Sequence, residues 1–247
     1  MANELDETTG PTRAEGREVR VIDRQIPVTV GFGSTLFEIA LWTVGTIPGI
    51  LLLAFKAAPV LHALGILAAG VLPGLIFLFL KIGALAYLRQ LQQRIQANAS
   101  EIDNYLEQRV VILQNVVGLV ERSIDLDKDV MKSVAEARGR GGAVTDAARN
   151  ERAQQMDGIL SRINVAFEAY PELRAHATIA DAMRQNSYLQ KEITAARTLY
   201  NDTVAQWNQD VFAWPTKQIV AARQGYTTRI PFTTTDEMRS QARAKFF

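Results

Sequence analysis

One almost unbroken apolar stretch, from Leu36 to Leu88, constrains this chain more than any other feature. Only Glu38, Lys56 and Lys81 carry a full charge within it. A stretch of this length and composition cannot be covered by the remaining, more polar chain of an ordinary small domain. It therefore predicts a helical membrane region over residues 31–88.

The apolar stretch has room for two membrane spans, because one span needs about 20 apolar residues. We expect the spans near residues 34–55 and 61–85, with a turn at residues 56–59 that contains Pro59. A competing interpretation has one true span and one interfacial segment kinked at Pro48.

Each expected span contains the pattern Gly-x-x-Pro-Gly. Small residues four apart allow membrane helices to approach closely, and proline bends them. Gly and Pro are also generally common in membrane helices, so the pattern alone does not require specific packing. We expect a helical hairpin packed through four glycines: Gly45, Gly49, Gly70 and Gly74.

The two charged residues Glu38 and Lys81 lie near the ends of the expected spans. There their side chains can reach the membrane interface, so we expect them to act as interfacial anchors. The alternative is an ion pair within a transport pathway, which would require both residues to lie deeper in the bilayer.

A long helix is expected to continue from the second span to about Arg138, because no proline interrupts residues 88–138. Its apolar residues recur at steps of three and four, which is one face of a helix that needs partner helices. This face comprises Ile102, Leu106, Val110, Leu113, Val117, Val120 and Ile124.

Two further helices are expected to pack on this face. One runs over residues 143–167 and ends before Pro171, and the other ends at Trp214-Pro215. We expect Tyr200 and Trp207 to pack against Leu106–Val120. The apolar set of the second helix is Ala148, Met156, Leu160, Ile163 and Phe167. That of the third is Ile179, Met183, Ile193, Ala196, Tyr200, Val204, Trp207, Val211 and Trp214.

The predicted fold is all-α: a membrane helical hairpin continues into an elongated antiparallel bundle of three long helices. Residues 1–30 form a loosely ordered tail and residues 89–216 the bundle. Residues 217–247 form a C-terminal segment that docks on the bundle or on a neighbour. The glycine run Gly139–Gly142 is expected to be a turn, because a phosphate-binding loop needs a preceding strand and a following Lys-Ser/Thr pair.

Composition excludes several classes of function. The chain has 27 Lys and Arg against 26 Asp and Glu, so it lacks the basic field that nucleic acid requires. It has no Cys and 2 His, of which only His176 lies in the polar region, so thiolate and histidine metal sites are not expected. We expect no catalytic residues, no metal and no cofactor, because no nucleophile with a base and no nucleotide loop is present.

The polar region resembles the LemA family. The resemblance begins with Ile102-Asp103, Leu106, Arg109, Asn115 and Val117, and with the run Val134–Arg138. It continues in the family's order and approximate spacing through Phe167–Leu173, Ala195–Arg197, Tyr200-Asn201, Asn208 and Pro215. The chain departs from the family pattern at Val111, where an Asp is usual, and at Gln114, where a Pro is usual.

The resemblance implies a membrane-anchored antiparallel helical bundle with the bundle on the cytoplasmic side. It provides no catalytic residues to assign. Polar residues inside a bundle must find partners, so the matching ones are expected to make interhelical contacts, with a shared binding groove as the alternative. These residues are Asp103, Arg109, Asn115, Arg138, Arg197, Tyr200 and Asn201.

Two functions remain open. The first is a structural or adaptor protein of the cell membrane, not an enzyme, with the lipid bilayer, copies of itself and other membrane proteins as partners and no nucleic acid. We expect exposed aromatic residues near the bundle ends to favour self-association: Trp214, Tyr226, Phe232 and Phe246-Phe247. The second is a membrane-active protein, either a membrane-shaping assembly or a small transport component, that works through its hairpin.

The expected topology follows from the flanking charges. Arg17, Arg20 and Arg24 precede the first span, Arg89 and Arg94 follow the second, and the turn has only Lys56. Because Lys and Arg near span ends accumulate on the cytoplasmic side, the N-terminus and the bundle are both expected to be cytoplasmic.

Overall fold

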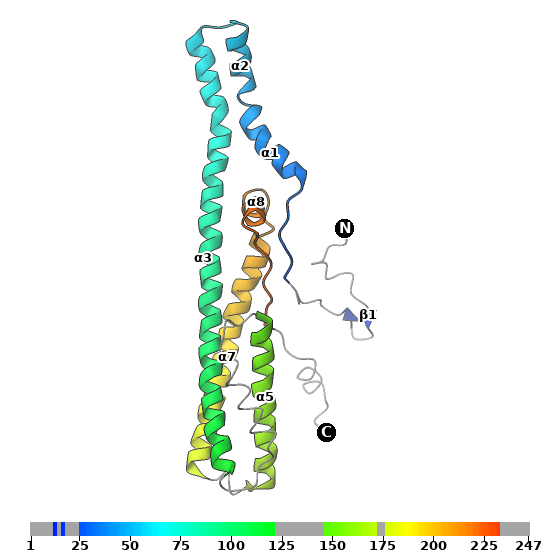
Figure 1. Ribbon diagram of the computed structural model, residues 1–247, viewed down its shortest axis with the longest axis vertical. Helices are drawn as coiled ribbons and strands as arrows, with labels where there is room; N and C mark the ends of the chain where they lie inside the picture. Colours follow the sequence, from blue (N-terminus) through cyan, green and yellow to red (C-terminus); the bar gives the residue numbers. More distant parts are fainter. Residues whose placement is uncertain (1–11, 14–15, 18–24, 122–145, 172–175, 233–247) are drawn as a thin grey trace. The chain divides into compact units, whose positions relative to one another are not determined.

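The computed structural model describes residues 12–13, 16–17, 25–121, 146–171 and 176–232. These residues form six helices and one pair of two-residue antiparallel strands, β1 (Thr12–Arg13) and β2 (Gly16–Arg17). The helices are α1 (Phe32–Thr43), α2 (Ile47–Ala54), α3 (Val60–Glu121), α5 (Asp146–Ala169), α7 (Ala177–Asp210) and α8 (Thr216–Arg223) (Figure 1).

The chain divides into two compact units, and α3 and α7 each contribute to both. The apolar unit comprises Arg24–Arg94 and Ala205–Arg229. The bundle unit comprises Met1–Asp23, Ile95–Val204 and Ile230–Phe247. The predicted all-helical character is confirmed.

In the apolar unit, α1 and α2 run beside the first part of α3 (Figure 1). The segment expected to form the first span, residues 34–55, consists of two helices, because the chain breaks at residues 44–46 and α1 and α2 are bent by 45°. Pro48 explains the break: it has no N–H for the Val44 carbonyl, and its ring disfavours a regular helix there. The Thr46 hydroxyl lies 2.9 Å from the carbonyl oxygens of Trp42 and Thr43, so it can donate to groups at the break.

Helix α3 is the one helix among the described residues that is long and apolar enough by itself to cross a membrane. Only 17% of its most apolar segment is buried within the structure. Helices α1 and α2 pass the same test when they are taken together as one broken span. The apolar region thus leaves most of its hydrophobic surface uncovered, which is consistent with membrane association.

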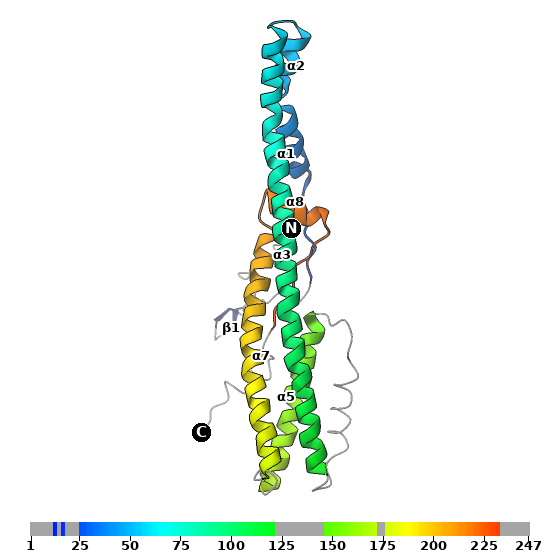
Figure 2. The ribbon, with the colours of Figure 1, turned by 90° about the vertical axis from the view of Figure 1, so that its left-hand side faces the viewer.

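In the bundle unit, α5 and the bundle parts of α3 and α7 lie side by side (Figures 1 and 2). Their shared core explains why the apolar residues recur at helical spacing. The core comprises Val110, Leu113, Val116, Val117, Val120, Met156, Ile159, Ile163, Phe167 and Ile179. The predicted face of the first long helix is therefore confirmed from Ile102 to Val120.

Several details of the helix predictions need correction. Ile159 is buried, whereas the predicted Leu160 is only partly buried. Trp214 is 57% exposed, because α7 ends at Asp210 and does not reach it. The expected end of the long helix near Arg138, Gly139–Gly142 and Ile124 lie outside the described residues.

Candidate functional site

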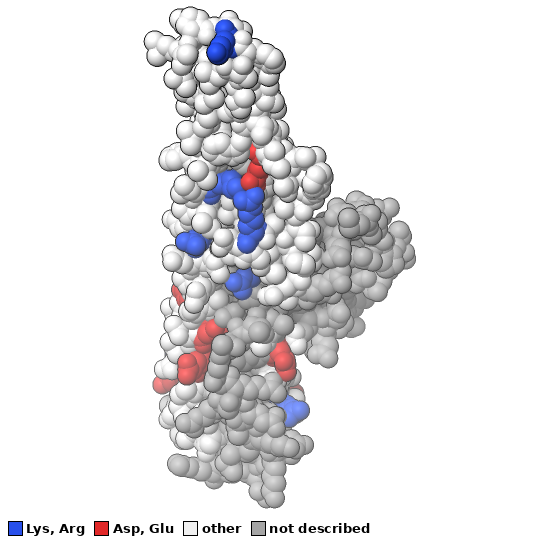
Figure 3. Space-filling model, turned by 45° about the horizontal axis from the view of Figure 1, so that its top comes forward, with Lys and Arg blue, Asp and Glu red and all other residues white. Residues whose placement is uncertain are grey.

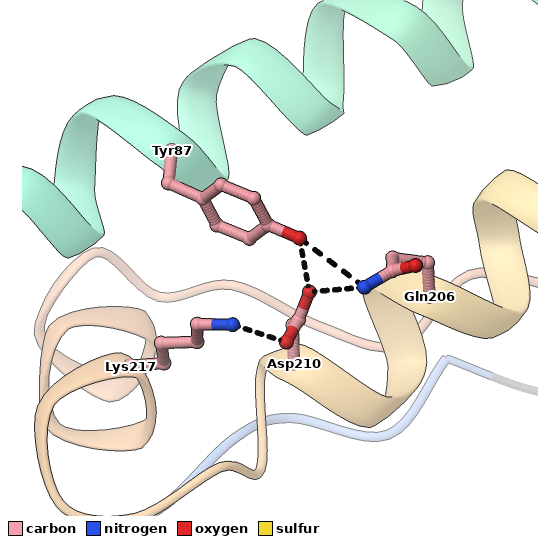
Figure 4. A network of polar contacts seen from close by, with 4 residues as sticks. All are labelled: Tyr87, Gln206, Asp210 and Lys217. Carbon is pink, nitrogen blue, oxygen red and sulfur yellow. Dashed lines mark hydrogen bonds and ion pairs between the residues drawn. The ribbon is translucent and has the colours of Figure 1, made fainter.

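The apolar unit contains a polar network at the point where α7 ends and α8 begins (Figure 4). Asp210, the last residue of α7, accepts a hydrogen bond from the Tyr87 hydroxyl of α3 at 2.7 Å. Gln206 Nε2 donates to the same Asp210 oxygen at 3.1 Å and to the Tyr87 oxygen at 3.2 Å. Lys217 of α8 forms an ion pair with the other carboxylate oxygen, and its Nζ lies 4.4 Å from the centre of the Tyr87 ring. The network therefore joins three helices through one carboxylate.

The protonation states of this network are fixed by its own contacts. Burial raises the pKa of the Asp210 carboxyl, but hydrogen bonds from Lys217, Tyr87 and Gln206 outweigh it and hold the pKa below its ordinary value. The hydrogen bond to Asp210, together with burial, raises the pKa of Tyr87. At neutral pH Asp210 is ionised and Tyr87 is protonated. Neither group readily exchanges a proton near neutral pH, so the arrangement suits a structural link between the helices.

A second charged cluster, here called the Glu38 cluster, joins α1, α3 and α8 in the apolar unit. Glu38 Oε2 accepts a hydrogen bond from Lys81 Nζ at 3.0 Å and from Arg223 Nη2 at 2.6 Å. The Glu38 and Lys81 side chains are about 15% exposed, whereas Arg223 is 54% exposed. The structure pairs Glu38 with Lys81. The expectation that both residues act as anchors at the membrane interface stays a prediction.

Aromatic rings surround the Glu38 cluster. Phe37, next to Glu38 in α1, packs edge-on against Phe77 of α3 at a centroid distance of 5.5 Å. Trp214 packs on the same Phe37 ring at 5.1 Å. Lys81 Nζ lies 5.7 Å from the centre of the Phe77 ring. Trp214, which precedes α8, and Arg223, the last residue of α8, thus contact two neighbouring residues of α1, Phe37 and Glu38.

The four predicted glycines lie at the contact between α1–α2 and α3. A Cβ atom added at Gly45 or Gly70 would collide with the backbone of the other glycine. A Cβ at Gly49 would lie 2.7 Å from Leu67, and one at Gly74 would lie 2.5 Å from the Trp42 ring. Any side chain at these positions would push the two helices apart.

In the bundle unit, Arg109 is the centre of a buried polar cluster. Its side chain is fully buried, and it donates to Asn186 Oδ1 at 3.0 Å and to Asp157 Oδ1 at 2.9 Å. Arg197 belongs to the same electrostatic environment: burial lowers its pKa, the charge of Asp157 opposes that effect and the charge of Arg109 adds to it. Arg109 therefore joins α3 to both α5 and α7.

Tyr200 and Asn201 bind the extended segment that follows α8. In the bundle unit, Asn201 Nδ2 donates to the Phe232 carbonyl at 3.0 Å and Asn201 Oδ1 accepts the Phe232 N–H at 2.8 Å. The Tyr200 ring packs edge-on against Phe232 at 5.1 Å, and its hydroxyl donates to the Ile230 carbonyl. Arg197 lies over the Phe232 ring at 5.4 Å.

The apolar unit repeats this arrangement seven residues later in α7. Asn208 exchanges two hydrogen bonds with the Arg229 backbone at 2.9 and 2.8 Å, and Trp207 Nε1 donates to the Thr227 carbonyl at 2.8 Å. The sequence contains the signal, an aromatic-Asn pair at residues 200–201 and again at 207–208. Sequence reasoning missed it, because nothing local indicates that these side chains bind an extended segment.

The expected packing of Tyr200 and Trp207 against Leu106–Val120 is wrong. The ring contacts of Tyr200 and Trp207 are with Phe232 and Tyr226. The antiparallel register of α3 and α7 gives the reason: in the bundle unit Asn98 donates to Thr203, and Arg109 donates to Asn186. Residues after Leu106 are thus opposite the earlier part of α7.

The remaining predicted polar residues are Asp103, Asn115 and Arg138. Asn115 is exposed and makes no hydrogen bond among the described residues. Asn115 follows Leu113 by two residues, which places it on the side of the helix opposite the buried face. Asp103 is half-buried in α3, and Arg138 lies outside the described residues. In the part of the chain that the structure describes, no group of three or more acidic or histidine side chains could hold a metal ion.

These features define a class: an all-helical protein whose bundle is continuous, through two of its helices, with an apolar helical region. The family model described as LemA matches residues 98–246, which is more than half of the chain. The protein therefore belongs to the LemA family, and the resemblance read from its residues is confirmed. No curated protein matches the chain.

Proposed function

We propose that this protein is a membrane-anchored structural or adaptor protein that assembles with copies of itself or presents its bundle to partner proteins at the cytoplasmic face of the cell membrane. One observation carries the proposal. The apolar helices leave large hydrophobic side chains exposed, whereas the same helix α3 contributes a closed, buried core to the bundle unit. Lipid is the partner that covers such a surface.

The proposed arrangement is a membrane hairpin with two spans that continues into an elongated antiparallel bundle of three long helices. Helices α1 and α2 form the first span, broken at residues 44–46, and the first part of α3 forms the second. Two spans return the chain to its starting side, and the flanking Arg residues favour the cytoplasm for both the N-terminus and the bundle.

Labelling of single cysteines tests this topology, because the chain has no native Cys. Thr12→Cys and Ser100→Cys are treated in intact cells with an impermeant maleimide, and permeabilised cells provide the control. The expected result is that neither site is labelled until the cells are permeabilised. Labelling at Thr12→Cys alone would indicate one span, and labelling at both would indicate the opposite orientation.

Self-association is the second part of the proposal. Trp214 is exposed, whereas Tyr226 and Phe232 are half-buried against α7, so Trp214 is the best placed of these three residues to contact a neighbour. Phe246-Phe247 lies outside the described residues. Mass photometry in detergent should show more than one protomer per micelle, and one protomer at every concentration would contradict the proposal.

The proposed role requires no catalysis, cofactor, metal or nucleic acid. Its polar clusters link helices, and Asp210 and Tyr87 keep their charge states near neutral pH. A purified protein with reproducible turnover that a single point substitution abolishes would overturn this assignment.

A second candidate function is a membrane-active protein, either a membrane-shaping assembly or a small transport component. The close glycine contacts favour it, because they hold the proposed hairpin in one specific shape. Replacing Gly45, Gly49, Gly70 and Gly74 by Leu should disrupt that shape. If assembly and partner binding persist unchanged in this variant, the hairpin is only an anchor and the first proposal is favoured.

A further inference from the structure

The Glu38 cluster has one negative and two positive charges. Lys81 already neutralises Glu38, and both of these side chains are largely buried. Arg223 uses only Nη2 to contact Glu38, and its side chain is 54% exposed. A guanidinium has five N–H donors, so Arg223 keeps donors that can bind an anion together with a net positive charge.

The Glu38 cluster marks the margin of the uncharged surface of the apolar unit. Between Glu38 and Lys81 the chain has a single charged residue, Lys56. Figure 3 shows basic and acidic side chains meeting on one face, next to a broad surface with almost no charge. Exposed Trp214 lies on Phe37, the neighbour of Glu38. Tryptophan is enriched where membrane helices meet the headgroup layer.

Helix α8 packs on the protein through its apolar side and leaves its polar side accessible to ligands. Its apolar residues Ile219, Val220 and Ala221 are buried against the protein, and its last turn contains Arg223. The helix therefore does not use its apolar face to enter lipid. It holds Arg223 at one end and follows Trp214 at the other, and both residues contact α1.

We propose that Arg223, with Trp214 beside it, binds the phosphate of an anionic phospholipid headgroup at the surface of the membrane. A single exposed guanidinium holds a free phosphate ion weakly, whereas a bilayer presents headgroups at high local concentration. The inference rests on the proposed membrane anchoring. It adds a lipid class and the residues that recognise it.

The test uses the full-length protein. Carbonate-washed membranes first establish that the wild type and each variant remain membrane-integrated, which separates failure of anchoring from failure of the headgroup site. Native mass spectrometry from detergent micelles then measures bound phosphatidylglycerol against phosphatidylcholine with the same acyl chains. Arg223→Gln should lower the preference for phosphatidylglycerol about five-fold, since one basic residue at an anionic surface contributes about 1 kcal/mol.

Two variants make the test specific. Glu38→Gln breaks the same ion pair as Arg223→Gln but raises the net positive charge, so it should strengthen phosphatidylglycerol binding. If the pair were only structural, both variants would change binding in the same direction. Arg184→Gln, in an exposed ion pair with Asp181 in the bundle unit, is the matched control and should change nothing.

Three results would overturn the proposal. They are unchanged lipid preference in Arg223→Gln, a shift in the same direction for Arg223→Gln and Glu38→Gln, and loss of bound phosphatidylglycerol on adding inorganic phosphate. The last result would show that the cluster binds free phosphate instead of a lipid headgroup.

Discussion

Gly45 and Gly70 meet backbone to backbone, so that a Cβ atom on either residue would overlap the other. This contact lies at the break between α1 and α2, where the chain also bends by 45°. Because neither residue has a side chain, the two backbones can approach closely at this point.

Gly70→Ala should therefore destabilise the apolar unit. The added methyl group must displace the backbone at Gly45, and overpacking of this kind costs about 1–3 kcal/mol. Gly65→Ala in the same helix is the control, because nothing lies within 4 Å of its Cβ position. It should be neutral or stabilising, since alanine favours a helix over glycine. Unfolding in detergent, followed by circular dichroism, compares the two. Equal stability in both variants would contradict the glycine contact.

Trp207→Ala should reduce the free energy of unfolding by about 3–5 kcal/mol, because the ring is 2% exposed. The ring packs on Tyr226 at 5.2 Å, and its N–H donates to Thr227. Trp207→Phe keeps an aromatic ring but removes this hydrogen bond, so it should cost less than Trp207→Ala. A loss below about 1 kcal/mol in Trp207→Ala would show that the ring does not hold the extended segment.

Asn208→Ala should destabilise the protein by about 1–3 kcal/mol, because it removes two hydrogen bonds to the backbone of Arg229. Asn104→Ala is the matched control: Asn104 is exposed in α3. Its effect should be within about 0.5 kcal/mol. Chemical denaturation measures both, and similar effects in the two variants would argue against the backbone contact.

The helical faces could be predicted from the sequence because burial on a helix depends on local spacing. Leu106, Val110 and Leu113 recur at steps of three and four and are buried. The contacts of Glu38 with Arg223, 185 residues away, depend on how helices pack in space. No local sequence pattern predicts the Glu38–Arg223 pair. The contacts of Asn201 and Asn208 with backbone groups could not be predicted for the same reason, although the sequence contains the repeated aromatic-Asn pairs.

The break between α1 and α2 shows a different limit. Both expected spans contain a proline in the same pattern, yet Pro73 lies inside α3 without interrupting it, whereas the chain breaks before Pro48. The two Gly-x-x-Pro-Gly patterns are alike in their local sequence. The local pattern therefore does not determine which proline interrupts a helix.

Arg109→Ala should cost about 3–5 kcal/mol, because it leaves Asn186 and Asp157 without the buried group that joins them. Arg184→Ala removes an arginine from an ion pair on the surface, where the side chains are 79% and 60% exposed, and should cost less than about 1 kcal/mol. Chemical denaturation of the two variants compares a buried with an exposed arginine. Comparable losses would show that the Arg109 cluster does not stabilise the bundle.

Asp210→Asn should lower the free energy of unfolding at neutral pH and change how this free energy depends on pH. The Asp210 carboxyl has a folded-state pKa below its ordinary value of 3.8, because hydrogen bonds from Lys217, Tyr87 and Gln206 outweigh the effect of burial. A group with a lowered folded pKa contributes stability that is complete above its unfolded pKa. That contribution is lost as the pH falls through the folded pKa.

The stability difference between the wild type and Asp210→Asn should therefore be constant between about pH 7 and pH 5, and should narrow as the pH falls to about 3. Asp202→Asn, at an exposed position in α7, controls for the chemical change and should stay within about 0.5 kcal/mol of the wild type at neutral pH. Denaturant unfolding at each pH gives the difference. Because the variant keeps the shape of the side chain but not its charge, a difference that stays constant down to pH 3 would mean that the charge of Asp210 does not hold α3, α7 and α8 together.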